Sequence, residues 1–373
     1  MAGPGPGRER PSTHGVAPGR EPRDDVSGWT LAGIATAAVA IRGLLAVAWT
    51  LSETGRVWTD YALLRDGYSY LAYARRLAGA DAAITFHDTR VFPGFPAILA
   101  GISRATTDLE AAALLLNWAA AAIAACLAAR LFRDARVGWG MALFPPSHLM
   151  YTSMALSEPT LLLCTLGGLS AARRGLTLGG GSLLGLAGLI RPMACFAVFA
   201  LVADEWRCGR RRRGAATGAV SLAVVGLGIA SLELARGWGL RSVQAQATAY
   251  GGAILAPPFW SLLATPWEGG VPAWKVVYVW GHVLAVSGAL ILLARRFQRG
   301  ARSAALPSFW LAGNTTFTLC VGSVWGFHEF HRFLLPALPP LLLAYSDYLP
   351  RRALTWGALG AVSFAMAAFG VLH

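Results

Sequence analysis

Charged residues are scarce in this sequence. Only 14% of its 373 residues are Asp, Glu, Lys or Arg, whereas 55% are hydrophobic. A soluble domain carries about 25% charged residues, so this chain has too few charges to cover the surface of a soluble protein of its size. The composition excludes an ordinary cytosolic globule and a disordered chain, and it favours an integral membrane protein.

Lysine and paired cysteines are also nearly absent. Lys275 is the single lysine, so arginine supplies the rest of the basic residues behind the net charge of +13. The five cysteines form no Cys-x-x-Cys pair. We expect them to be small buried side chains, with neither a disulfide framework nor a metal set. The sequence also lacks a glycine-rich phosphate loop and a soluble segment able to hold a nucleotide.

Long apolar runs set the expected architecture. A membrane-crossing helix needs about 20 apolar residues, and we expect about 11 such helices in an all-α polytopic bundle. The first, 29–52, is too long for a signal-peptide core and is interpreted as an uncleaved anchor. The others are expected near 109–130, 137–155, 157–172, 176–190, 192–204, 215–235, 273–294, 305–325, 333–349 and 353–372.

The distribution of arginine predicts the topology. Residues 1–28 are expected to be a disordered cytoplasmic tail, and 29–373 a single transmembrane domain. With the N-terminus on the cytoplasmic side, nearly all the net positive charge lies on the inner side of the membrane, as the positive-inside rule requires. The Arg-rich run at 207–213 is then a topology signal; binding of nucleic acid or anionic lipid is the alternative. Two long outer loops remain, 53–108 and 236–272.

The first outer loop is the richest in polar chemistry. Asp66, Tyr70 and Tyr73 follow helical spacing and share one face, which predicts an amphipathic juxtamembrane helix. A carboxylate at the start of that helix is favoured by the helix dipole, so a plain capping role for Asp66 is the alternative. Further on, 91–105 is short and begins with two prolines, and the charge pattern requires it to stay on the outer side as an interfacial or re-entrant helix. A full crossing, which would reverse the orientation of everything downstream, is the alternative.

A second group of polar residues lies near the end of this loop. Asp88 follows His87 and precedes Arg90. Two acids about 20 residues apart in one loop, Asp66 and Asp88, are able to converge on one site. The alternative is a solvated turn in which Asp88 pairs with Arg90, a contact that stabilises little at a surface.

Three further charged positions lie between apolar runs on the expected outer side. Glu158 precedes a proline and Arg191 precedes another, and charges at such depth are functional candidates. A capping acid and a snorkelling arginine are the alternatives.

His328, Glu329, His331 and Arg332 form a third group. Zinc is a weak interpretation because no third ligand has suitable spacing, whereas Arg332 at a helix mouth suits a phosphate.

Taken together, these residues resemble the GT-C superfamily of membrane glycosyltransferases, which includes dolichyl-phosphate-mannose mannosyltransferases and ArnT-like and PIG-V-like enzymes. The chain departs from the family at Gly67, where a second acid is frequent, and at Phe95 and Phe333, where Tyr is frequent. The resemblance therefore does not identify the transferred sugar. The matching segments are DGYSYLAYA at 66–74, DTRVFPGFP at 88–96, SEP at 157–159, GLAGLIRP at 185–192 and HRFLLP at 331–336.

The resemblance implies transfer of a sugar, mannose or another hexose or pentose, from a polyprenyl-phosphate donor to an acceptor. The reaction is expected on the outer face of a bacterial-type plasma membrane, with inversion at the anomeric carbon. Asp66 is then the base and Asp88 the second acid. The expected substrate-binding residues are Tyr70, His87, Arg90, Glu158, Arg191, His331 and Arg332.

No resident cofactor is implied, and a divalent metal is left open. The expected partners are membrane lipid, the lipid-linked donor, and a glycan, lipid or protein acceptor, without nucleic acid. A flippase or small-molecule transporter is one alternative, and a structural subunit is another. The gathering of polar residues on one side favours an enzyme over a transporter, which more often shows repeat symmetry.

Overall fold

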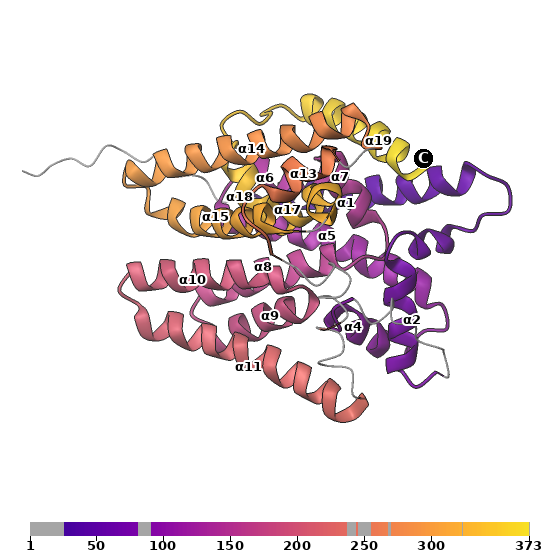
Figure 1. Cartoon of the computed structure of the whole chain (residues 1–373), viewed down its shortest axis with the longest axis horizontal. Coiled ribbons are helices and arrows are strands. Elements are labelled where there is room, and N and C mark those ends of the chain that lie inside the picture. The colour runs from indigo at the N-terminus through magenta and orange to yellow at the C-terminus, as the bar shows by residue number, and fades with distance from the viewer. Residues whose placement is uncertain are drawn as a thin grey trace, which may run out of the picture.

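The computed structural model describes residues 26–80, 91–236, 244, 255–267, 270–322 and 324–372. Over these residues the secondary structure is helical, apart from an isolated antiparallel bridge between Leu255 and Val321. The prediction of an all-α protein is confirmed. The longer helices pack side by side as a bundle (Figure 1). Most of the expected N-terminal tail, 1–25, lies outside the described residues.

Five of the described helices are long and apolar enough to cross a membrane. They are α1 (Gly28–Leu51), α5 (Leu109–Phe132), α11 (Arg211–Arg236), α14 (Ala273–Gln298) and α19 (Ala353–Leu372). A sixth span is formed if α7 (Pro146–Ser153) and α8 (Glu158–Arg173), bent by 101° at their junction, count as one. The prediction of about 11 spans is therefore not confirmed.

Many of the other expected spans contain helices that are shorter than a bilayer requires. A helix rises about 1.5 Å per residue, so α9 (Thr177–Ile190) covers only about 21 Å of a hydrocarbon core about 30 Å thick. The other short elements are η1 (Trp58–Leu63), α2 (Gly67–Leu77), α4 (Gly94–Ile102), α6 (Ala135–Leu143), η2 (Pro192–Ala194), α10 (Cys195–Arg207), α13 (Trp260–Ala264), η3 (Thr265–Trp267), η4 (Arg302–Ala304), α15 (Ala305–Cys320), α16 (Val324–His328), α17 (Phe330–Leu334), η5 (Leu335–Ala337) and α18 (Leu338–Ala344).

The segment expected as one helix over 137–155 is broken where two prolines follow each other. Pro145 and Pro146 lack N–H donors and separate α6 from α7. The break frees carbonyls at the end of α6, and the fully buried Arg42 of α1 donates to one of them, Ala142 O, at 3.2 Å. Its Nε also donates to Thr152 Oγ1 at 2.9 Å. A buried cation thus satisfies an interrupted backbone inside the bundle.

Glycines allow α8, α9 and α11 to pack at short distance. A Cβ added at Gly185 would lie 2.6 Å from Val224 of α11, and one at Gly180 would lie 2.8 Å from Ala172 of α8. Small residues at such positions let helix backbones approach closely, as in other helix pairs within membranes. Likewise, a Cβ at Gly94 would meet the backbone of Leu189 at 2.6 Å, which holds the short α4 against the end of α9.

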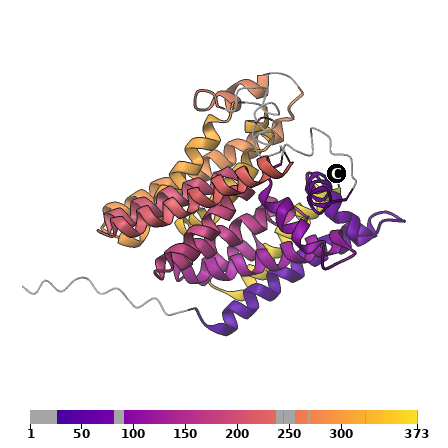
Figure 2. The same cartoon turned by 90° about the horizontal axis from the view of Figure 1, so that it is seen from below.

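Basic segments that are far apart in sequence gather at one end of the bundle. Arg173 at the end of α8 pairs with Asp204 of α10 at 3.3 Å. Arg207 stacks 4.0 Å from the ring of Phe297 in α14. The first residue of α8, Glu158, is separated from Arg173 by the helix itself, about 23 Å of rise. The two ends of the bundle therefore carry different groups of charges. Figure 2 shows the long helices of the bundle side by side, seen from below.

Candidate functional site

Arg332 of α17 joins two carboxylates from distant parts of the chain. Its Nη1 donates to Asp66 Oδ2 at 2.7 Å, and its Nε donates to Glu158 Oε1 at 2.5 Å. Asp66 is the N-cap residue of α2, yet its side chain makes no capping hydrogen bond. The Asp66 carboxylate therefore pairs with Arg332 and makes no capping hydrogen bond, although it lies at the helix start that the dipole favours.

Arg191 completes this ion-pair cluster from the end of α9. Its Nη2 donates to Glu158 Oε1 at 2.7 Å, so one carboxylate oxygen bridges two guanidinium groups. The Glu158 side chain is only 1% exposed, whereas Asp66 is 23% exposed. Glu158 is thus a buried structural counter-charge, and Asp66 is the carboxylate of this pair that solvent or a substrate can reach.

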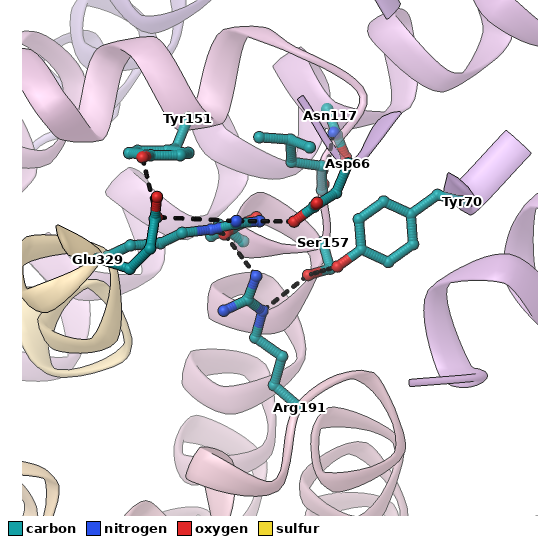
Figure 3. A network of polar contacts seen from close by, with 10 residues as sticks. Asp66, Tyr70, Asn117, Tyr151, Ser157, Arg191 and Glu329 are labelled. Carbon is teal, nitrogen blue, oxygen red and sulfur yellow. Dashed lines mark hydrogen bonds and ion pairs between the residues drawn. The ribbon is translucent and has the colours of Figure 1, made fainter. Parts of the chain in front are cut away.

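Hydrogen bonds from neighbouring helices fix the loop that carries Ser157 and Glu158 (Figure 3). Asn117 of α5 donates to the carbonyls of Met154 and Leu156, both at 2.7 Å. These bonds satisfy backbone groups exposed between α7 and α8. The Ser157 hydroxyl then receives a hydrogen bond from Arg191 Nε at 2.9 Å.

Tyr70 approaches the same serine from α2. Its phenol oxygen lies 2.9 Å from Ser157 Oγ, and its ring meets Phe95 edge-on with centroids 5.2 Å apart. Only 3% of Tyr70 is exposed. Burial raises the pKa of Tyr70, so the phenol stays neutral and available for hydrogen bonding. Its position links α2 to the Ser157–Arg191 side of the cluster.

Aromatic rings line the other side of Arg332. The guanidinium carbon lies 5.0 Å from the ring centroid of Tyr151, which also donates a hydrogen bond to Glu329 Oε2 at 3.1 Å. The His331 ring lies 5.6 Å from Tyr151 and 5.5 Å from Tyr278, centroid to centroid. Residues of α7, α14 and α17 therefore form an aromatic wall beside the ion pairs (Figure 3 labels Tyr151 and Glu329).

Three polar atoms of this cluster are buried and make no hydrogen bond within the described part of the chain. They are Glu158 Oε2, Arg332 Nη2 and His331 Nδ1. Such atoms are rare in folded proteins because leaving a buried polar group unsatisfied costs about 1–3 kcal/mol. Arg332 Nη2 is left as a donor, which suits a phosphate oxygen, and Glu158 Oε2 is left as an acceptor, which suits a hydroxyl.

Six of the predicted site residues come together here: Asp66, Tyr70, Glu158, Arg191, His331 and Arg332. The other three, His87, Asp88 and Arg90, lie outside the described residues. The sequence analysis did not identify Asn117, Tyr151 or Tyr278, included Ser157 only as part of a matching motif, and considered Glu329 only as a zinc ligand. Asn117 offered a signal, because an amide inside an apolar span is unusual and is retained for a contact.

An apolar hollow of about 310 Å³ opens near the cluster. It lies between α4, α9 and α11, and Leu189, one of its lining residues, is two positions before Arg191. The lining residues are Pro93, Gly94, Ala97, Ile98, Leu186, Leu189, Gly228 and Leu232. A chain of hydrocarbon is the chemical class that such a surface accepts.

No protein-family model matches this sequence, and no curated protein matches it either. Its function is therefore inferred from the geometry of the site and from the resemblance of the short motifs.

Proposed function

We propose that the protein is a membrane glycosyltransferase. It moves a sugar from a polyprenyl-phosphate donor to an acceptor on the outer face of the plasma membrane. The observation that carries this proposal is the contact of Arg332 with both Asp66 and Glu158. It places the partly exposed carboxylate of Asp66 beside the guanidinium group of Arg332, to which Glu158 also joins Arg191. A base and a phosphate-binding cation are what transfer from a sugar phosphate needs.

In this reaction Asp66 takes the proton of the acceptor hydroxyl. The acceptor oxygen forms a bond to the anomeric carbon as the bond from that carbon to the phosphate oxygen breaks. Negative charge grows on the departing lipid phosphate, and Arg332 and Arg191 stabilise it. Attack opposite to the leaving group inverts the anomeric carbon. The second acid, Asp88, is retained as a candidate that orients the acceptor.

The buried residues around these groups have positioning roles in the proposal. Glu158 holds both arginines in one orientation through its Oε1 atom. Tyr70 is too buried for direct contact with a sugar face, so we assign it to positioning Ser157 and thereby Arg191. The half-buried rings of Tyr278 and His331 take over the role of binding the sugar ring, and the buried ring of Tyr151 positions Arg332.

The apolar hollow between α4, α9 and α11 supports a lipid-linked donor. A prenyl chain lying there would end near the C-terminus of α9, where Arg191 is able to meet its phosphate. Each methylene buried from water contributes about 0.8 kcal/mol, so a long prenyl chain supplies binding free energy independently of the sugar.

Reconstituted vesicles test the proposal against the flippase and the structural subunit. Vesicles are loaded with a polyprenyl-phosphate sugar labelled in the sugar. An enzyme transfers label to a new product, whereas a flippase moves the intact donor between leaflets without a new product. A structural subunit does neither. Movement of intact donor without transfer, seen with purified protein and suitable acceptors, would overturn the proposal.

A further inference from the structure

The exposed tryptophans among the described residues lie at or near the ends of helices. Trp29 is the second residue of α1, Trp206 is the penultimate residue of α10 and Trp58 begins η1. Tryptophan concentrates at the two interfaces of a membrane, where its ring contacts lipid and its N–H meets polar groups. These positions therefore mark the levels at which the bundle meets the headgroup regions.

The largest such group lies in one short stretch, 255–274, which we name the tryptophan segment. Trp260, Trp267 and Trp274 are 56%, 88% and 68% exposed. By contrast, Ser261 and Leu262 are buried in the protein. Glu268 is the single charged residue in the sequence of this segment, and it lies outside the described residues. The segment therefore has one face against the protein and one large aromatic face turned away from it.

The backbone of the tryptophan segment is fixed to the end of α15. Ala256 N donates to Cys320 O at 2.8 Å, and Phe259 N donates to Leu319 O at 2.9 Å. At the next turn, a Cβ at Gly326 of α16 would lie 2.6 Å from Ser261 Oγ, which shows how closely α13 lies on α16. Because α17 and Arg332 follow α16 directly, the segment and the candidate site are held together.

The exposed face of the segment continues into a span. Trp274 and Val277 stand one turn apart at the start of α14, and Leu284 and Ile291 follow at seven-residue intervals. All four are more than half exposed, on one side of a helix long enough to cross a membrane. A face of this kind on a spanning helix is in contact with lipid. The neighbouring Lys275 is suited to extend its ammonium group towards headgroups.

We propose that the tryptophan segment is a membrane-interface anchor. It lies in the headgroup region of the leaflet at which α14 begins, with Trp260, Trp267 and Trp274 among the lipids. Through its contacts with α15 and α16 it holds Arg332 near the depth of lipid phosphates. The anchoring depends on α14 crossing the membrane, and only its benefit for a lipid-linked donor rests on the proposed function.

Spin labels in lipid nanodiscs test the anchor. The five cysteines are replaced by alanine, and a single labelled cysteine is introduced as Trp267→Cys. Leu284→Cys is the matched control within the span, and Thr54→Cys is the matched control in an exposed loop. Collisions with oxygen report lipid, and collisions with a water-soluble nickel chelate report water.

We expect the ratio of oxygen to nickel collisions at position 267 to fall between the values at 284 and 54. A ratio equal to that at 54 would put the segment in water and overturn the proposal. Low collision rates with both reagents would show cover by protein, for example by a second copy of the chain, and would overturn it too.

A measurement of sugar transfer with two donors then separates the anchoring role of the segment from the catalytic step. Trp267→Ser should lower turnover of a long-chain donor in a bilayer several-fold and leave turnover of a short, water-soluble donor unchanged. An equal loss with both donors would contradict the role in setting depth. If the unsubstituted protein transfers no sugar at all, the proposed function fails, while the spin-label ratio still decides whether the segment is an anchor.

Discussion

Arg332 and Asp66 form a 2.7 Å ion pair although 266 residues separate them in the sequence. The pair joins the N-terminus of α2 to α17, and Glu158 joins Arg332 to the first turn of α8. A partly exposed carboxylate held against a buried guanidinium is poised, in our proposal, to receive a proton as negative charge develops on a phosphate beside it.

Asp66→Asn is expected to abolish sugar transfer. The amide keeps the shape of the side chain but does not accept the acceptor proton, so we expect a loss of about 10²–10⁴-fold in turnover. Asp108→Asn is the matched control, because Asp108 caps α5 through Ala111 N and asparagine caps equally well. Rates of label transfer in vesicles provide the measurement. Near-normal turnover by the Asp66→Asn protein would remove Asp66 as the base.

Arg332→Lys is expected to weaken use of the donor more than use of the acceptor. Lysine keeps the charge but loses the forked geometry that reaches Asp66 and Glu158 together. The KM for the donor should rise roughly 10-fold or more, since a charge-assisted hydrogen bond is worth about 1.5–3 kcal/mol, with the KM for the acceptor little changed. Arg104→Lys, at an exposed position, is the control. The opposite pattern of KM values would exclude a phosphate-binding role for Arg332.

Asn117→Leu is expected to disturb the site, although Asn117 is not one of the proposed reacting or substrate-binding groups. The substitution removes both bonds to the carbonyls of Met154 and Leu156, and leaving such groups unsatisfied costs about 1–3 kcal/mol each. Thermal unfolding in detergent should show the lower stability, and kcat should fall because Ser157 and Glu158 are no longer held in place. Unchanged stability would show that these hydrogen bonds do not support the loop.

Ala97→Phe is expected to fill the apolar hollow beside α9. Ala97 is exposed on α4, and the larger side chain would occupy the space assigned to the prenyl chain. The KM for a long-chain donor should rise while that for a short-chain donor stays the same. Ala119→Phe, at an exposed position on α5, is the control. If both donors respond alike, the prenyl chain binds elsewhere.

The sequence was sufficient to predict the class of fold and most of the charged cluster. Too few charges and many apolar runs predicted a helical membrane protein, because burial in lipid is the arrangement that satisfies such a composition. Asp66, Glu158, Arg191 and Arg332 were each marked by a charge next to an apolar run or a proline. Their convergence was only an expectation, since motif order does not fix distances.

Other features depended on packing that the sequence does not reveal. The break at Pro145 was missed because the flanking residues continue the apolar pattern, and only the tertiary position of Arg42 shows how the freed carbonyls are satisfied. The roles of Ser157 and Tyr151 arise from partners 34 and 178 residues away. The expected number of spans is not confirmed, and apolar composition alone does not distinguish a crossing helix from a short buried one.

The most direct test of the account is label transfer by the purified protein in vesicles that contain a polyprenyl-phosphate sugar and a set of membrane acceptors. The account predicts that the unsubstituted protein forms a labelled glycosylated product with inverted anomeric configuration, and that the Asp66→Asn protein, inserted and folded, forms none. Equal product formation by both proteins, or release of labelled sugar in the absence of any glycosylated acceptor, would contradict it.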